Sequence, residues 1–479
     1  MASELKNKFV FQFLLSASQV LLPLISYPYI TRVLGPANLG IVNYADFLSQ
    51  LFIIFAAFGI PFYAVRELAV VKHNPEKRAT LIKEIGLLHL IFSICSTLIF
   101  ILVTFNYWSH NLVLYLLASF NIFISALSFD WYIQGMEAFK FAAIRSLLLR
   151  IAMLFAFFIF IKTAADYSIY FGVFSAATFI IAVVNSYKLF SENRLGNQPV
   201  YIKKHLKPLW HFFLTSSAIS IYIYFDTILL QLITHNAKSV GYYTAVLKMV
   251  KICLLMMLTI GTVLMPRLSF LVSTGNKEAI KNYLDKSMQL ILLTGIPVGF
   301  GFIFLAPEII LTIAGDKFLP AIPVMRILAF LPLTIGLSNI FCFQTLIPFN
   351  QEKKFLTAVI IGCVASVGLN LLLIPILKES GAAWANITTE IIITIITGFQ
   401  AFKIIRFNPC LPVVIQTVVA TVLFIPVIFI CKFLFTNAVI ILLVAIPLCG
   451  IIYFMVQFLI FKNQVAREMK EYVWNLLNL

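Results

Sequence analysis

Charged residues are scarce in this chain of 479 residues. Only 11% are Asp, Glu, Lys or Arg, whereas soluble domains carry about 25%. The chain is 61% hydrophobic with a mean hydropathy of +1.00. Apolar runs of about 20 residues recur along its length, each long enough to cross roughly 30 Å of hydrocarbon as a helix. The composition therefore predicts an all-α polytopic membrane protein.

Motifs for metal binding and catalysis are absent. The seven cysteines lie in or beside apolar runs without metal-ligand spacing, and the six histidines form no HExxH or comparable cluster. No predicted outside loop exceeds about a dozen residues, so that face has no catalytic domain. We expect no metal, no cofactor and no enzymatic activity. The apolar stretch at the N-terminus continues through Pro23 to Ile30, which predicts an uncleaved first membrane helix rather than a signal peptide.

About fourteen transmembrane helices are expected from the apolar runs, so both termini lie on one side of the membrane. The predicted spans are 9–31, 39–62, 85–106, 111–133, 144–162, 167–187, 209–233, 239–265, 287–305, 319–345, 356–377, 382–402, 412–434 and 438–461.

Positive charge is distributed unequally between the two sets of loops. Loops on the side of the termini hold 26 Lys and Arg residues, and the alternate loops hold six. This bias predicts cytoplasmic termini. The formal net charge of +16 is then explained by topology and by contact with anionic membrane lipids, so nucleic acid is not an expected partner.

Three basic segments on the inner side have the composition of amphipathic helices lying on the membrane surface. They cover residues 66–85, 267–288 and the tail 462–479.

A weak internal repeat aligns Gly40 with Gly241 at an offset of 201 residues, and the same offset places Ser16 on Ser217. Six spans separate the copies, so both enter the membrane in the same direction. The sequence therefore predicts two pseudo-symmetric six-helix lobes followed by two extra helices. The expected parts are an N-lobe at 1–190, a cytoplasmic linker at 191–208, a C-lobe at 209–405, two further helices at 406–461 and a cytoplasmic amphipathic tail at 462–479.

Polar residues inside the spans fall on stripes at helical spacing. Steps of three and four in span 8 join Gly241, Thr244, Lys248 and Lys251, while the flanking residues are apolar. Similar stripes are Asn43, Asp46 and Gln50 in span 2, and Asn386, Glu390, Thr394 and Thr397 in span 12. A water-filled cavity between the lobes would accept all the stripes together, whereas isolated ion pairs that fasten helices are the alternative.

Positive charge predominates locally in spans 7 and 8, where Lys248 and Lys251 face one aspartate, Asp226. Asp226 and Lys248 lie at similar predicted depth, roughly 16 Å from the turn between the two spans, which predicts a pair. Lys251 lies about one turn deeper than this aspartate. An anionic group in the cavity is therefore expected, and a diphosphate would gain more than a single carboxylate.

Other charged residues have two interpretations each. Arg32 and Arg326 lie toward the outer ends of their spans, near the exit of the cavity, where they would bind phosphate or anchor at the interface. Asp46 and Glu390 are candidate ion-coupling or head-group-orienting carboxylates, because a poorly hydrated carboxylate takes up a proton readily.

The segment YPYITRVLGPANLGIVNYA at 27–45 resembles the opening signature of the Wzx-like polysaccharide flippases, a branch of the multidrug/oligosaccharidyl-lipid/polysaccharide (MOP) exporter superfamily. The similarity extends to the span pattern over essentially the whole chain. Matching positions are Tyr27, Pro28, Arg32, Leu34, Gly35, Pro36, Gly40 and Tyr44.

This resemblance implies a MATE-like two-lobed fold with a central cavity in the bacterial cytoplasmic (inner) membrane. It also implies a flippase that moves undecaprenyl-diphosphate-linked oligosaccharide units from the inner to the outer leaflet, with H⁺ or Na⁺ as a coupling ion and contacts to polysaccharide assembly proteins. Basic cavity residues of such flippases hold the diphosphate-sugar head group. Here these are Lys248, Lys251, Arg326 and Arg32, with Asp226, Asp46 and Glu390 as cavity carboxylates.

Three alternatives remain at this point. A MATE-type multidrug or organic-cation antiporter shares the fold but needs an acidic cavity, whereas spans 7 and 8 are net basic. A membrane glycosyltransferase or polymerase needs a sizeable extramembrane loop with catalytic groups, and none is present. A structural scaffold leaves the charges inside the membrane unexplained.

Overall fold

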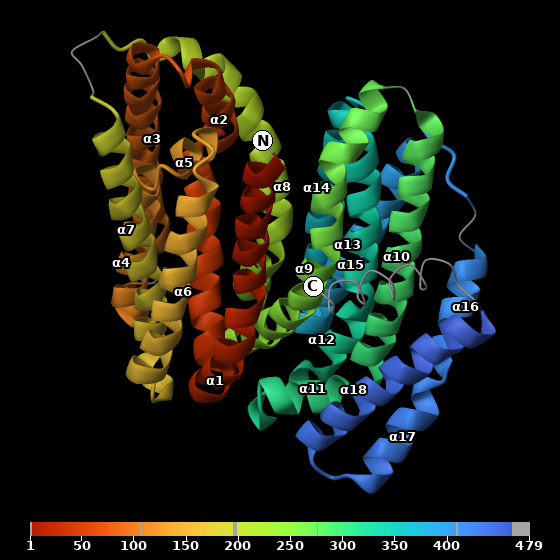
Figure 1. Ribbon diagram of the computed structural model, residues 1–479. Coiled ribbons are helices and arrows are strands. Elements are labelled where there is room, and N and C mark those ends of the chain that lie inside the picture. The colour runs from red at the N-terminus through yellow and green to blue at the C-terminus, as the bar shows by residue number, and fades with distance from the viewer. Residues whose placement is uncertain (1, 106–107, 195–198, 275, 409–410, 462–479) are drawn as a thin grey trace. The chain divides into compact units, whose positions relative to one another are not determined.

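The computed structural model describes residues 2–105, 108–194, 199–274, 276–408 and 411–461 (Figure 1). Every regular element within these ranges is a helix. The expected tail at 462–479 lies outside the described residues. By contacts the chain forms two compact units, Met1–Gly241 and Tyr242–Leu479.

Long helices build the first unit. Its helices are α1 (Ala2–Ala57), α2 (Ile60–Val71), α3 (Pro75–Thr104), α4 (Trp108–Ile124), α5 (Asp130–Gly135), α6 (Phe139–Phe160), α7 (Tyr167–Glu192) and α8 (Lys203–Thr234), with 3₁₀ turns at Ser125–Leu127 and Ala164–Asp166. Helix α1 is interrupted at Gly35, whose φ of 70° and ψ of 174° are not helical. A glycine allows this break without a Cβ clash.

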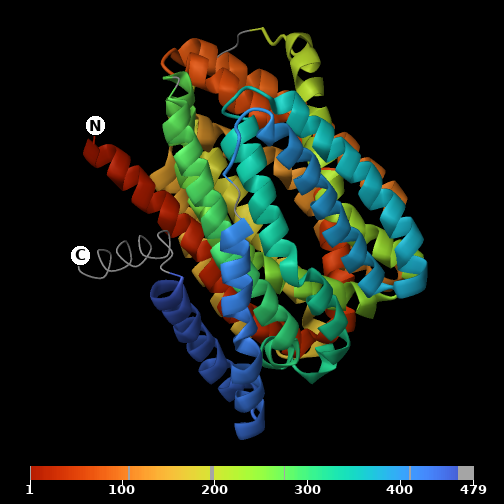
Figure 2. The ribbon, with the colours of Figure 1, turned by 90° about the vertical axis from the view of Figure 1, so that its right-hand side faces the viewer.

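The second unit follows from α9, which begins in the first unit. Its helices are α9 (Ala237–Ser273), α10 (Lys277–Phe304), α11 (Ala306–Ile313), α12 (Ile322–Ile327), α13 (Leu331–Asn339), α14 (Glu352–Leu377), α15 (Glu379–Phe402), α16 (Leu411–Val422), α17 (Phe424–Leu434) and α18 (Ala438–Met455). Helices α14 and α15 run side by side, and the blue helices α17 and α18 pair at one edge of this unit (Figures 1 and 2).

Residues 316–346 form a broken membrane segment. It passes through 3₁₀ turns at Asp316–Ala321 and Leu328–Phe330 and ends in a π-helix at Ile340–Leu346. Pro320 lies in the first 3₁₀ turn, and Pro323 and Pro332 lie in the first turns of α12 and α13. Proline lacks the N–H that a continuous helix needs, which accounts for the interruptions. A second π-helix, at Val456–Ile460, follows α18.

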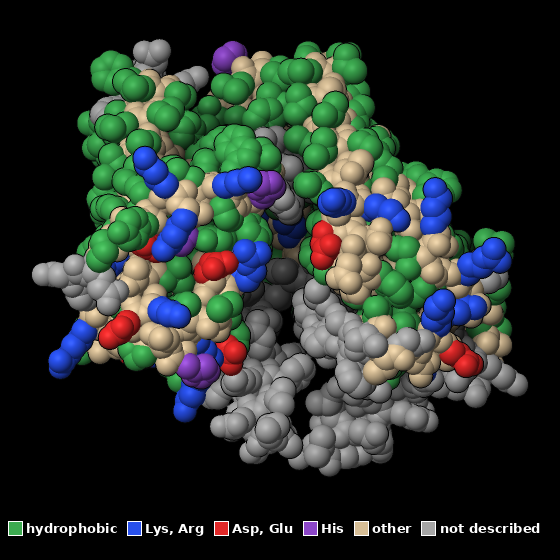
Figure 3. Space-filling model, turned by 90° about the horizontal axis from the view of Figure 1, so that it is seen from above, with side chains coloured by type: hydrophobic (Ala, Val, Ile, Leu, Met, Phe, Trp, Pro, Cys, Tyr) green, Lys and Arg blue, Asp and Glu red, His purple; other side chains and the backbone are tan. Residues whose placement is uncertain are grey.

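Eleven segments among the described residues are long and apolar enough to cross a membrane. Helices α8 and α9 add 32 and 37 residues of continuous helix. The protein is therefore an all-helical, multi-pass membrane protein, as the composition predicts. In the view from above Figure 1, Lys and Arg side chains are more frequent than Asp and Glu on the visible described surface (Figure 3).

Two of the expected surface helices are wrong as continuous elements. Residues 66–85 are divided between α2 and α3, and residues 267–288 between α9 and α10. Asn74 accepts a hydrogen bond from the backbone N–H of Lys77, and Asn276 accepts one from Ala279. Each asparagine therefore caps the start of a long helix, and the basic residues beyond it belong to that helix.

Candidate functional site

The predicted lysines lie on the less buried side of α9. Lys248 and Lys251 are half-buried, whereas the neighbouring apolar side chains are at most 4% exposed. These neighbours are Val246, Leu247, Met249 and Val250. Thr244, on the same predicted stripe, is fully buried. The stripe beyond Lys251 falls on side chains outside the described set.

The predicted carboxylates of the first unit lie on α1 and α8. Asp226 is 2% exposed and Asp46 is half-buried. The side chain of Gln50 donates a hydrogen bond to Asp46 Oδ1 at 3.4 Å, so these two members of the predicted stripe share a face. Asp46 also lies close enough to Tyr170 and Tyr224 to act on both electrostatically. Polar side chains of three helices of this unit, Gln50, Tyr170 and Tyr224, therefore lie near Asp46.

Glu390, on α15, is 7% exposed and has no hydrogen-bond or ion-pair partner among the residues that the structure describes. Thr394, one turn later on the same stripe, donates to the carbonyl of Thr334 on α13 at 3.1 Å. That part of the stripe thus faces another helix. Keeping a charged carboxylate without donors in such surroundings is costly.

The two predicted arginines are both exposed. Arg32 lies three residues before the break at Gly35, and Arg326 lies in the last turn of α12. Arg32, Asp46 and Asp226 belong to the first unit, and Lys248, Lys251, Arg326 and Glu390 to the second. The Asp226–Lys248 pair and a common cavity stay predictions.

A buried polar cluster that the sequence analysis missed joins α2, α3 and α8. His205 Nδ1 lies 2.7 Å from Tyr63 Oη, and His205 Nε2 lies 2.9 Å from Glu84 Oε2. Lys204 Nζ lies 2.8 Å from the same Glu84 oxygen. The backbone N–H of Tyr201 donates to Glu84 Oε1 at 2.8 Å. Both oxygens of Glu84 are thus engaged by α8 and the segment before it.

The protonation of this cluster follows from its surroundings. Burial raises the pKa of Tyr63, and the negative charges of Glu67 and Glu84 add to this effect against Arg66. Tyr63 therefore keeps its proton beside His205 Nδ1, while His205 Nε2 lies against the Glu84 carboxylate. Burial alone would raise the pKa of Glu84, but hydrogen bonds from Lys204, His205 and the backbone of Tyr201 lower it. In sequence the four residues are scattered over positions 63 to 205, so no spacing motif could reveal them.

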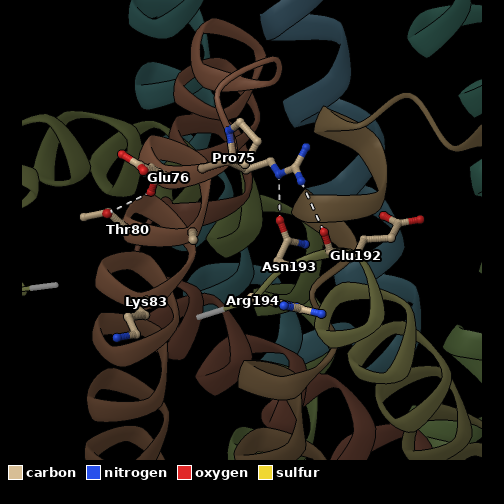
Figure 4. Close-up of a pocket in the computed structure, with 9 residues that line it drawn as sticks. Pro75, Glu76, Thr80, Lys83, Glu192, Asn193 and Arg194 are labelled. Carbon is tan, nitrogen blue, oxygen red and sulfur yellow. Dashed lines mark hydrogen bonds between the residues drawn. The ribbon is translucent and has the colours of Figure 1, made fainter. Parts of the chain in front are cut away.

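A cavity of about 520 Å³ lies beside the start of α3 (Figure 4). Arg78, one of the cations that line it, donates from Nε to Asn193 Oδ1 at 2.6 Å. Its guanidinium also donates to the carbonyls of Lys72 and Glu192. Arg78 thus fastens the end of α7 to α3. The lining residues are Pro75, Glu76, Arg78, Ala79, Thr80, Lys83, Glu192, Asn193 and Arg194.

Two glycines mark a close backbone contact in the first unit. A Cβ built on Gly40 would lie 1.7 Å from the carbonyl oxygen of Ala237, and one built on Gly241 would lie 1.9 Å from that of Pro36. An offset of 201 converts Gly40 into Gly241 and Pro36 into Ala237. The contact is therefore reciprocal at the offset that the sequence alignment uses.

The same offset relates two buried carboxylates, Glu84 on α3 and Asp285 on α10. Asp285 Oδ1 accepts the backbone N–H of Asn408 at 3.0 Å, as Glu84 accepts that of Tyr201. Asp285 Oδ2 has no hydrogen-bond partner among the described residues. Each carboxylate binds the backbone of the segment that follows a long helix, α7 for Glu84 and α15 for Asp285, and Glu84 also bonds Lys204 and His205 of α8.

Comparisons with known proteins agree with this architecture. A protein of Escherichia coli (strain K12) named "Putative O-antigen transporter" is 27% identical over 404 residues, covering 81% of this chain and 95% of that relative. The lipid II flippase MurJ in an inward closed conformation matches with a TM-score of 0.73 at 16% identity, over 95% of this chain and 100% of that chain. An inward-facing multidrug resistance MATE family transporter of the MOP superfamily matches with a TM-score of 0.60 at 15% identity, over 80% of this chain and 94% of that chain.

The family model described as "Polysaccharide biosynthesis protein" matches residues 5–272. Because this is more than half of the chain, the protein belongs to the polysaccharide biosynthesis protein family, and its fold is that of the MurJ and MATE transporters.

Proposed function

We propose that the protein is a flippase that moves undecaprenyl-diphosphate-linked oligosaccharide units from the inner to the outer leaflet of the bacterial cytoplasmic membrane by alternating access. The observation that carries this proposal is the pair of half-buried lysines, Lys248 and Lys251, in an apolar stretch of α9. Two cations one turn apart inside a membrane helix favour an anionic ligand. The E. coli relative named as an O-antigen transporter supports a lipid-linked glycan as the source of that anion.

Fourteen spans remain the proposed topology. The eleven candidate spans, α8, α9 and the division of α1 at Gly35 together supply fourteen helical segments. The reciprocal glycine contact and the equivalent carboxylates Glu84 and Asp285 support two six-helix repeats followed by two further helices. The Lys and Arg bias between loops supports cytoplasmic termini.

Within this proposal the charged residues have separate roles. Lys248 and Lys251 bind the diphosphate, and Arg32 and Arg326 contribute near the exit. Asp226 partners a lysine while the substrate is absent. Asp46 and Glu390 are the coupling candidates for H⁺ or Na⁺, and Glu390 is the stronger because it is buried without a described partner. Anionic lipids and polysaccharide assembly proteins are further proposed contacts, and no chemical step is assigned.

A multidrug or organic-cation antiporter is the alternative, because the MATE transporter shares the fold. Half-buried lysines argue against it, since like charges repel a cationic substrate. Fold similarity alone does not decide between the substrates.

Export of a lipid-linked glycan in a strain that lacks its own flippase tests the proposal. The double variant Lys248→Ala/Lys251→Ala should lower export at least tenfold while protein abundance stays near normal. Lys238→Ala is the matched control, because Lys238 is exposed near the start of the same helix. If the double variant exports glycan at the rate of the parent protein, the proposed cationic site is wrong. Export of organic cations instead of glycan would favour the antiporter.

A further inference from the structure

We propose that Tyr63, Glu84, Lys204 and His205 form a latch, which holds the start of α8 on α2 and α3 and opens as a step of transport. The opening step rests on the proposed flippase function, whereas the holding role does not. Glu84 is 1% exposed, and Tyr63 and His205 are 4% and 3% exposed. Glu84 of α3 therefore holds α8 directly, and His205 connects this carboxylate to Tyr63 of α2.

The latch exceeds what the fold requires. In the second repeat, Asp285 holds its linker through the backbone N–H of Asn408. The helix that follows that linker, α16, begins Leu-Pro-Val-Val and brings no cation or imidazole to the carboxylate. Since one bond to the linker suffices there, the added bonds from Lys204 and His205 serve α8 itself.

Partial opening of the latch is unfavourable. A buried carboxylate that loses its donors must become hydrated or remain unsatisfied, and either change affects all its partners together. Lys204 is 54% exposed at its side chain, so water already reaches one member of the latch. The arrangement thus favours two states, one with every bond made and one with Glu84 hydrated.

Apolar contacts beyond the latch also hold the N-terminal half of α8 against the end of α1 and the start of α2. Phe58, just after α1, stacks on Phe213 of α8 with ring centroids 4.4 Å apart. A Cβ on Gly59 would lie 2.6 Å from the backbone nitrogen of Phe213, and Gly59 has a φ of 77° that favours glycine. The N-terminal half of α8 is therefore held along about two turns, with the latch as its polar end.

Hydrogen–deuterium exchange of the full-length protein in lipid nanodiscs tests the holding role without any substrate. Glu84→Gln should raise exchange of residues 201–214 about tenfold, because it removes the charged acceptor shared by Lys204 and His205. Tyr63→Phe, a milder change, should raise it less and serves if Glu84→Gln fails to fold. Asp285→Asn is the matched control and should affect residues near 408 but not 201–214. Unchanged exchange at 201–214 in folded Glu84→Gln or Tyr63→Phe protein would overturn the latch.

A reversible cross-link tests the opening step. Cysteines in place of Phe58 and Phe213, in a background without the seven native cysteines, can be joined by a short bifunctional thiol reagent. Joining them should reduce export at least tenfold, and cleavage of the linker should restore it. Export that continues through the cross-linked protein would overturn the opening step. If no variant or parent exports glycan, the proposed function fails, while the exchange result still decides the holding role.

Discussion

Acidic side chains differ between the two units in how fully they are partnered. In the first unit, Glu84 accepts from Lys204, His205 and the backbone of Tyr201, and Glu192 binds both Lys188 and Tyr132. In the second unit, one oxygen of Asp285, of Glu308 and of Glu379 has no hydrogen-bond partner among the described residues. Glu390 has none at either oxygen within the same set. In the first unit both oxygens of Glu84 and of Glu192 bind neighbouring groups. In the second, Asp285 and Glu308 each bind through one oxygen, to Asn408 and Lys432, and keep the other without a described hydrogen-bond partner.

The close backbone contact of Gly40 and Gly241 in the first unit should show the largest effect on stability. Gly40→Ala or Gly241→Ala would press a methyl group into a backbone carbonyl, which cannot move as a side chain would. Each should cost more than about 4 kcal/mol and prevent accumulation of folded protein. Gly301→Ala is the control, because nothing lies within 4 Å of the position that its methyl group would take, and it should be neutral or mildly stabilising. Near-normal amounts of both variants would disprove the close contact.

The cluster of Asp130, Arg145 and Asn185 in the first unit should show the next largest effect on stability. Arg145 donates to Asn185 and, at 3.4 Å, to Asp130, while Asn185 is fully buried. Arg145→Met should therefore lower the free energy of unfolding by about 2 kcal/mol. Arg66→Met, which breaks an exposed pair with Glu67, should cost about 0.5 kcal/mol or less. Thermal unfolding in detergent measures both, and equal losses would contradict a fastening role for this cluster.

The contribution of Tyr63 should depend on pH. Tyr63→Phe removes one buried hydrogen bond and should cost about 1 kcal/mol near neutral pH. The pKa of Tyr63 is raised above its ordinary 10.0 by burial, so the folded protein holds this proton more tightly than the unfolded chain. The stabilisation is complete below pH 10 and is lost as the pH rises through the folded-state pKa. The difference between parent and variant should shrink above that pH, and a constant difference would refute this account.

Glu390→Gln should have the smallest effect on stability, within about 0.5 kcal/mol, because no described partner is lost. Its effect on the ion-gradient dependence of export should nevertheless be clear. Asp226→Asn provides the contrast from the first unit, since Asp226 is 2% exposed and has partners. Asp226→Asn should lower the amount of folded protein more than Glu390→Gln does. If Glu390→Gln transports with unchanged gradient dependence, its coupling role is wrong.

Membrane class and family were within reach of the sequence because hydropathy and a local motif need no tertiary information. The repeat offset was equally accessible, and the contact between Gly40 and Gly241 shows why those glycines are needed. Lys248 and Lys251 stood out because lysine is costly in an apolar helix. These features could be predicted because each depends on residues that are close in sequence or on a repeat within it.

Tertiary contacts account for what the sequence did not reveal. His205 and Glu84 lie 121 positions apart and meet only when α8 packs on α3. Their basic surroundings resemble a solvated interfacial helix, because a pattern of charges cannot distinguish a residue in water from one with a buried partner. The two expected surface helices failed for a local reason, since Asn74 and Asn276 start new helices within them.

The length of α3 sets the depth of the latch in the membrane. Its 30 residues span about 45 Å, whereas the hydrocarbon core is about 30 Å thick. The uncharged stretch from Ile85 to Thr104 is long enough for that core, so we expect Glu84 at its boundary, next to the headgroup region. At that depth an anionic lipid headgroup would compete with Glu84 for the exposed ammonium group of Lys204. Membranes rich in acidic lipid should therefore weaken the Lys204–Glu84 ion pair, and under the proposed function they would ease the opening of the latch.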